Sequence, residues 1–227
     1  MWNYLEDCGV KVDHNESDEF QRSLLFYSVY RCDYNDRTIL LERLLPLGID
    51  PTQQDYEDVT PLMAACRANN FKAVIRLINA MPGDSEAYYT KDGGFNVNDH
   101  IDTTWQHDPR WRGCGGTEII NGADRAKNTP LLYAVLHQNS YMVLALLAAG
   151  ARVDYLNTSS GMTPLILAVR GSQYGSFALC SILVKAGADV MQVDTELRTA
   201  LDFAFIHARY KASCCVDLGD LRVLAHA

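Results

Sequence analysis

The residues best suited to metal chemistry lie between positions 100 and 114. His100, His107 and Cys114 carry imidazole and thiol groups, and Asp102 and Asp108 add carboxylates. These are the ligand types of zinc sites. However, the two histidines are seven residues apart and the set matches no compact zinc motif. Two alternatives stay open: a metal-dependent or enzymatic site, and solvated polar residues on a loop with no ligand.

Motifs of established catalytic classes are missing from the sequence. It contains no G-x-S-x-G elbow, Walker A loop, H-E-x-x-H or Rossmann glycine pattern. The glycine-rich segment 113–116 follows no apolar strand. A nucleophile and a base can still meet in space without adjacency in sequence. We nevertheless expect a protein that is not an enzyme and has no cofactor or metal.

Composition narrows the class of protein. The chain has 227 residues, of which 48% are apolar, and a formal charge of −8. A chain of this length and apolarity can bury a core of one large or two small domains. The negative charge argues against a nucleic-acid partner. No stretch approaches the ~20 apolar residues that span a bilayer, and the N-terminus does not resemble a signal peptide.

The cysteines favour a reducing compartment. There are seven, an odd number, with irregular spacing and no C-x-x-C pair. Cys214 and Cys215 are adjacent, which does not suit a structural disulfide. Secreted disulfide scaffolds carry even, patterned sets, so we expect a cytoplasmic or otherwise intracellular protein.

Four segments repeat one pattern, in which a threonine is usually followed by proline and leucine and the sixth residue is alanine. A fifth, weaker copy has serine at both its first and sixth positions. A small sixth residue is what two closely packed helices require. The copies begin at Ser23, Thr60, Thr129, Thr163 and Thr199, with spacings of 37, 69, 34 and 36 residues.

A second signature follows the first in several copies. Apolar helical patterns end at Gly48, Gly150 and Gly187, and glycine stops a helix because it can adopt the left-handed conformation. Threonine before proline starts one, because the hydroxyl caps and proline tolerates the first turn. Each unit is therefore predicted to be helix, turn, helix, glycine stop and polar hairpin.

This arrangement resembles the ankyrin repeat, whose T-P-L-H-x-A motif and ~33-residue period it matches. The resemblance covers roughly residues 20–227 outside one insertion. It implies an all-α solenoid of about five helix-turn-helix repeats with short β-hairpin-like connecting loops. In the family the motif histidine ties down the loop between repeats, so its absence bears on loop rigidity and not on the fold. Its positions hold Phe26, Met63, Leu132, Ile166 and Asp202.

The spacing of 69 residues predicts a long insertion at about residues 82–121. This segment has no Thr-Pro-Leu start and contains six glycines, too many for two packed helices. We expect a loop that contributes to partner binding, because aromatic residues dominate binding hot spots. The alternatives are a loop that only covers the repeat groove, and disorder. The aromatic residues are Tyr88, Tyr89, Phe95, Trp105 and Trp111.

The resemblance also implies a binding surface made of hairpin tips and of the fifth residue of each motif, which points outward. Aromatic residues there predict an amphipathic stripe. The alternative is that the insertion or the N-terminal segment covers them. The fifth residues are Tyr27, Ala64, Tyr133, Leu167 and Phe203. The predicted partner-binding residues are Tyr27, Tyr56, Tyr133, Tyr155, Leu167, Phe203, Trp105 and Trp111.

The acidity lies mostly outside the repeats. An N-terminal segment or cap at 1–19 has one base and six acids, and the insertion at 82–121 has three bases and seven acids. Their net charges are −5 and −4, whereas the rest has +1. The remaining units are repeats 1–2 at 20–81 and repeats 3–5 with a C-terminal cap at 122–227. If charge steers association, the partner is basic.

The predicted function is non-catalytic protein–protein interaction, with a partner protein bound by the groove and the insertion. We expect no nucleic-acid or membrane partner, and a monomer. The first alternative is a regulatory inhibitor or a secreted effector that acts on a host protein. The second is the metal-dependent or enzymatic site at His100, His107 and Cys114.

Overall fold

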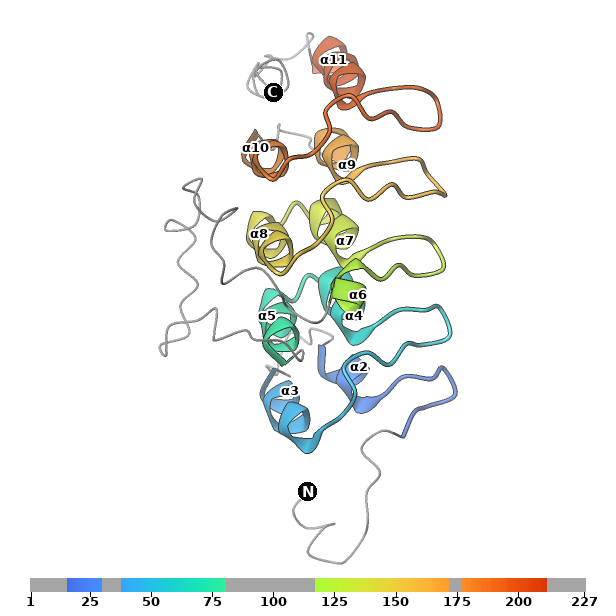
Figure 1. The fold of residues 1–227 in the computed structure, drawn as a ribbon, viewed down its shortest axis with the longest axis vertical. Helices are drawn as coiled ribbons and strands as arrows, with labels where there is room; N and C mark the ends of the chain where they lie inside the picture. The colour runs from blue at the N-terminus through green and yellow to red at the C-terminus, as the bar shows by residue number, and fades with distance from the viewer. Residues whose placement is uncertain (1–15, 30–37, 81–116, 172–176, 212–227) are drawn as a thin grey trace, which may run out of the picture.

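In the computed structural model, two parallel columns of helices stack along the molecule, and hairpin loops project from one side (Figure 1). The structure describes residues 16–29, 38–80, 117–171 and 177–211. No strand occurs within these ranges, apart from an isolated bridge between Asn157 and Met162. The described part of the chain is therefore all-α.

The inner column lies next to the hairpins, and the outer column lies behind it (Figure 1). The described helices pack on their partners in the other column and on their neighbours in the stack, and the last inner helix packs on the inner helix before it. The inner helices are α2 (Leu24–Val29), α4 (Pro61–Arg67), α7 (Pro130–Leu136), α9 (Pro164–Gly171) and α11 (Ala200–Lys211). The outer helices are α3 (Thr38–Leu44, continued by η1 at Leu45–Leu47), α5 (Phe71–Ala80), α8 (Ser140–Ala148) and α10 (Phe177–Lys185).

The inner helices begin where the repeated motif predicts. The backbone N–H of Met63 donates to Thr60 Oγ1 at 3.2 Å, and Leu132 N–H donates to Thr129 Oγ1 at 3.3 Å. Each capping threonine has an extended backbone and is followed by a proline. The cap satisfies an N–H group that the first turn leaves without a helical acceptor.

The outer helices α8 and α10 end at left-handed glycines, as expected. Gly150 has φ +94° and Gly187 has φ +93°. The N–H groups of Ala151 and Ala188, one residue later, donate to Leu146 and Leu183 carbonyls that the helix end leaves open.

A single apolar core runs along the stack from Leu25 to Ala204. The small residue of each motif is buried between the columns, as in Ala65, Ala134 and Ala168. Four positions of the missing motif histidine are also buried, and their residues are Phe26, Met63, Leu132 and Ile166. At these four positions the chain therefore has apolar side chains packed in the core instead of a histidine that holds the loop between repeats.

The stack is continuous across residues 81–116. Helix α4 packs against α7, and α5 packs against α8. The backbone N–H of Arg125 donates to the Glu57 carbonyl at 3.0 Å, and Asn139 Nδ2 donates to Asn69 Oδ1 at 2.8 Å. The helices on the two sides of that segment are therefore direct neighbours.

The short helix α6 (Thr117–Asn121) differs from the sequence prediction of a loop over 82–121. Ile120 is fully buried in the core. Asn121 Nδ2 donates to the Gly150 carbonyl at 3.1 Å, and Asn121 Oδ1 accepts from Arg152 N–H at 2.7 Å. Residues 117–121 thus belong to the stack, because they bury apolar surface and bond to the next hairpin.

The contribution of the threonine caps to stability can be measured by mutation, with Ser23 as the comparison, because this serine occupies the capping position of the first motif. Thr129→Ala should lower the free energy of unfolding by about 1 kcal/mol, because Leu132 N–H loses its acceptor. Ser23→Ala should change it by less than about 0.5 kcal/mol, because the buried Ser23 Oγ has no hydrogen-bond partner. Urea denaturation followed by circular dichroism measures both. Equal losses in the two variants would contradict this account of the caps.

Candidate functional site

Each hairpin turns around one carboxylate or amide side chain. Asp55 Oδ1 accepts from the backbone N–H groups of Glu57 and Val59 at 2.8 and 3.0 Å. The corresponding oxygens of Asp18, Asp124 and Asp194 also accept from backbone amides of their own hairpins. Charged acceptors strengthen such hydrogen bonds. These side chains therefore hold the shape of the loops that form the hairpin edge of the molecule.

The fourth hairpin varies this design. Asn157 takes the position of the aspartate, and its Oδ1 accepts from Ser159 and Ser160 N–H at 2.8 and 3.0 Å. Its Nδ2 donates to Asn128 Oδ1 of the preceding hairpin at 2.7 Å. The amide therefore closes its own turn and also ties two hairpins together, which a carboxylate without a proton cannot do.

The second oxygen of the aspartate connects the hairpin to an inner helix at two places. The hydroxyl of Tyr27 in α2 donates to Asp18 Oδ2, and the hydroxyl of Tyr133 in α7 donates to Asp124 Oδ2. In both pairs the tyrosine lies nine residues after the aspartate. Two of the predicted binding residues thus have their orientation fixed by the loop beside them.

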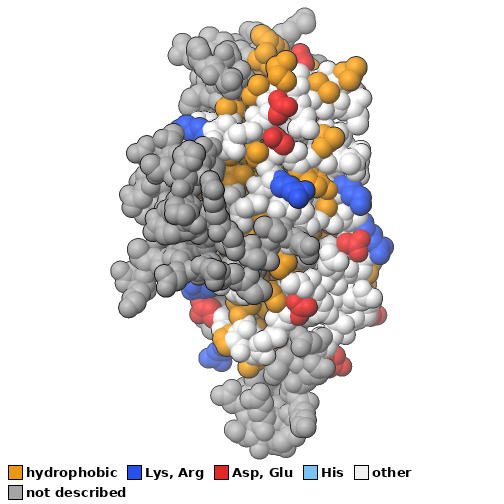
Figure 2. Space-filling model, in the orientation of Figure 1, with side chains coloured by type: hydrophobic (Ala, Val, Ile, Leu, Met, Phe, Trp, Pro, Cys, Tyr) orange, Lys and Arg blue, Asp and Glu red, His pale blue; other side chains and the backbone are white. Residues whose placement is uncertain are grey.

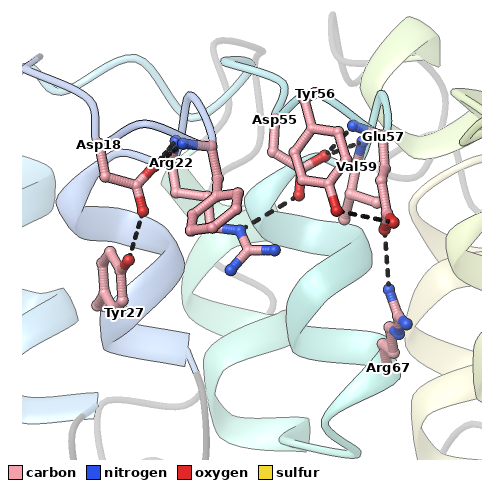
Figure 3. A network of polar contacts seen from close by, with 9 residues as sticks. Asp18, Arg22, Tyr27, Asp55, Tyr56, Glu57, Val59 and Arg67 are labelled. Atoms are coloured by element: carbon pink, nitrogen blue, oxygen red, sulfur yellow. Dashed lines mark hydrogen bonds and ion pairs between the residues drawn. The ribbon is translucent and has the colours of Figure 1, made fainter.

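Arginine side chains take the same role in the other two aspartate hairpins. Arg22 Nε, from the first hairpin, lies 3.5 Å from Asp55 Oδ2 of the second (Figure 3). Arg198 Nη2 lies 2.7 Å from Asp194 Oδ2 within the last hairpin. Burial pushes the pKa of Asp194 upward, but hydrogen bonds from Arg198 and from backbone amides outweigh it and place the pKa below its ordinary value.

The first two hairpins also share an aromatic contact. The Phe20 and Tyr56 rings lie 5.8 Å apart between centroids, and the Arg22 guanidinium lies 5.0 Å from the Phe20 centroid. Tyr56 hydroxyl donates to Glu57 Oε1 at 3.2 Å, and Glu57 lies 3.6 Å from Arg67 of α4 (Figure 3). The result is a connected polar and aromatic surface over α2 and α4.

The structure describes five of the predicted binding residues as exposed or half-buried. Tyr27 and Tyr56 are each 41% exposed, and Tyr133, Tyr155 and Leu167 are half-buried. Trp105 and Trp111 lie outside the described residues, as do His100, His107 and Cys114.

Two fifth residues do not point outward as expected. Ala64 is fully buried, and Phe203 is only 7% exposed. The reason at Phe203 is local, because the Arg198 guanidinium lies 4.6 Å from its ring centroid and covers it.

Sequence reasoning missed the first hairpin. Asp18 and Phe20 fall in or beside the segment assigned to an acidic terminus, and Arg22 was given no role. A signal was present, because Asp55, Asp124 and Asp194 each lie five residues before a motif threonine, and Asp18 lies five before Ser23. Applying that spacing to the weakest copy would have identified this hairpin.

The described residues offer little reactive chemistry. Cys66 is fully buried in α4, and burial raises the pKa of its thiol, which disfavours the nucleophilic thiolate. Within these ranges no group of three or more His, Cys, Asp or Glu side chains could hold a metal ion. None of the helices described is long and apolar enough to cross a membrane.

Comparison with known families identifies the type of repeat to which these helices and hairpins belong. A family model described as three copies of the ankyrin repeat matches residues 116–194. Residues 116–194 of this chain are ankyrin repeats. The matched range begins one residue before α6, so the family model also places α6 with the repeats rather than with the preceding segment.

A curated relative gives a second comparison for this chain. The chain is 31% identical over 192 residues to the glycerophosphocholine phosphodiesterase gde1 of Schizosaccharomyces pombe. The similar region includes 78% of this chain but only 16% of that relative's length.

The Tyr133–Asp124 pair predicts a specific pH dependence. Burial and the Asp124 carboxylate raise the pKa of Tyr133 from 10.0 to about 12. The free energy that Tyr133 contributes to folding is therefore fully present below pH 10.0 and declines as the pH rises toward about 12. Tyr133→Phe should lose this part of the alkaline decline. Urea denaturation across this pH range measures it in both proteins.

Tyr27 and Tyr56 also have raised pKa values, but both remain in Tyr133→Phe, so the difference between the two proteins isolates Tyr133. A difference spectrum of tyrosinate absorbance provides an independent titration of the same group. Identical alkaline stability curves would show that Tyr133 ionises alike in the folded and unfolded chain.

Proposed function

We propose that this chain is a non-catalytic protein-binding module of five ankyrin repeats, with one insertion between the second and the third. The four helix pairs of the described chain, followed by α11, support the repeat number. The direct contacts of α4 with α7 and of α5 with α8 support an insertion that interrupts the sequence without separating the repeats. The partner protein binds across the inner helices and the hairpins.

The observation that carries this proposal is the fixed orientation of the inner-face tyrosines. Tyr27 and Tyr133 are bonded to aspartates of their hairpins but are not fully buried. Tyrosine offers a large amphipathic contact area with few rotatable bonds. A side chain that is already ordered loses less conformational entropy when a partner binds. The inner face therefore has the properties of a preorganised binding surface.

Charge supports a basic partner surface. Seven carboxylates and one arginine belong to the described residues of the first two hairpins, and the acids are Glu16, Asp18, Glu19, Asp50, Asp55, Glu57 and Asp58. A cluster of negatively charged carboxylates on a binding surface raises the association rate of a positively charged partner. The acidic residues at 1–15 and 82–116 extend this charge along the chain.

The phosphodiesterase named in the comparison does not lead us to propose that activity here. The similar region corresponds to 16% of that protein, and the described part of this chain is accounted for by ankyrin-type helices. A regulatory inhibitor or an effector that acts on a host protein remains a form of the same binding function, distinguished by the identity of the partner.

Partner binding should depend on Tyr133 and on Trp105. Affinity purification with mass spectrometry identifies the partner, and titration calorimetry then measures its affinity. Tyr133→Ala and Trp105→Ala should each weaken binding by more than ~1 kcal/mol. Tyr133→Phe controls for the ring, since it removes only the hydroxyl that bonds to Asp124.

Leu47→Gln is the control for a general surface effect, because Leu47 is exposed in η1, which continues the outer helix α3. The association rate should also fall as ionic strength rises. Unchanged affinity in both alanine variants would refute the assigned surface, and a rate independent of salt would refute the basic partner.

The insertion can be removed to separate folding from binding. Replacing residues 82–116 by a flexible glycine–serine linker should preserve the helical circular dichroism and cooperative unfolding, because Arg125–Glu57 and Asn139–Asn69 contacts join the repeats directly. Affinity for the partner should fall, because Trp105 and Trp111 are lost. A protein that loses its helical signal would contradict an insertion that is separate from the stack.

A further inference from the structure

One hairpin position changes from polar or small residues to large aliphatic ones along the stack. The residue just before each turning aspartate or asparagine is Ser17, Gln54 and Ala123 in the first three hairpins, but Leu156 and Val193 in the last two. Both Leu156 and Val193 are exposed, together with Met191 and Leu197 of the last hairpin. In Figure 2, hydrophobic side chains lie exposed over the hairpin nearest the C-terminal end of the stack. We call Leu156, Met191, Val193 and Leu197 the apolar hairpin patch.

Leu197 is the most unusual member of the patch. It has φ +61° and is 80% exposed. The left-handed region is unfavourable for residues with a side chain, and polar residues such as Asn and Asp tolerate it better than leucine. The three equivalent left-handed positions hold Gln21, Asp58 and Lys127. Leu197 therefore combines an unfavourable backbone with an apolar side chain in water, and neither feature helps the chain to fold.

Met191 lies at a position that joins neighbouring hairpins elsewhere. Asn121 and Asp154 occupy the same place, three residues before the turning residue, and each accepts a backbone N–H of the following hairpin. Met191 has no comparable acceptor oxygen and is 73% exposed. The last hairpin thus offers an apolar side chain where the third and fourth hairpins offer a polar tie.

The charges around the patch are acidic. The last hairpin contains Asp189, Asp194 and Glu196 against one arginine. Arg198 is already engaged, because its guanidinium lies 2.7 Å from Asp194 and 2.6 Å from Glu196. An occupant that brings apolar side chains to the patch therefore meets a surplus of negative charge beside it.

Resting on the proposed binding function, we infer that the apolar hairpin patch docks an extended peptide segment of the partner. This segment carries at least two apolar side chains and a lysine or arginine beside them. The apolar side chains contact Leu197 and Met191, and the basic side chain meets Asp189. Because the opposite end of the stack is acidic and aromatic, this docking also fixes the direction in which the partner crosses the inner face.

A displayed library of random linear peptides tests the inference with the full chain as bait. The wild type should enrich peptides with neighbouring apolar residues and an adjacent lysine or arginine. Their dissociation constants should rise about tenfold or more for Leu197→Gly combined with Met191→Gln. Leu47→Gln, at an exposed leucine of η1 far along the chain from the patch, should change them less than about twofold.

Leu197→Gly should not weaken folding, because glycine adopts a positive φ without strain. An unchanged or higher urea midpoint for the double variant confirms that lost binding is not lost structure. Peptides that bind the double variant as tightly as the wild type would overturn the inference, as would a library with no enrichment over the double-variant bait. Self-association of the wild type that the double variant abolishes, measured by sedimentation, would also overturn it and assign the patch to a second copy of the chain.

The two proposals can fail separately. Peptides that lose affinity for Tyr133→Ala but not for the double variant leave the binding function standing and reject only the patch.

Discussion

The hydrogen bonds between one side-chain oxygen and the backbone amides of its hairpin determine the rest of the structure. A hairpin of this kind has N–H groups that point inward, and no neighbouring strand accepts them. Asp55 and its counterparts supply the acceptor. The turn is then tight enough to place a threonine cap five residues after the aspartate, at the start of the next inner helix. In each of these hairpins the carboxylate therefore sets where the next inner helix begins.

The same carboxylate also organises the surface that we assign to binding. Its second oxygen is free for another partner, which is a tyrosine of the inner helix in two repeats and an arginine in two others. The choice has a consequence for exposure. A tyrosine leaves its ring partly exposed on the inner face, whereas Arg198 lies over Phe203 and removes that ring from the surface. The hydrogen bonds and ion pairs that hold the hairpins to the inner helices therefore also determine which side chains are exposed for partner binding.

The sequence predicted what depends on local physics and missed what depends on neighbours. Helix starts at Thr60 and Thr129 and stops at Gly150 and Gly187 follow from capping and from backbone freedom within a few residues. Helix α6 was missed because the glycines before it concealed the pair Ile119 and Ile120, which gains stability only by burial against the following repeat. Phe203 was placed on the surface for the same reason, since its place in the core and beneath the Arg198 guanidinium depends on three-dimensional neighbours.

In a solenoid each repeat contacts only its neighbours, so residues that do not serve those contacts are free to vary. The left-handed hairpin position shows this freedom, because its backbone is fixed by the turn while its side chain points away from the stack. Three such positions hold polar residues that water solvates, and the fourth holds Leu197. Folding does not explain leucine there, since glycine or asparagine meets the backbone requirement at lower free-energy cost. A contact outside the chain does explain it. The acidic and aromatic hairpins at one end and the aliphatic hairpins at the other then give the binding surface of the stack a direction.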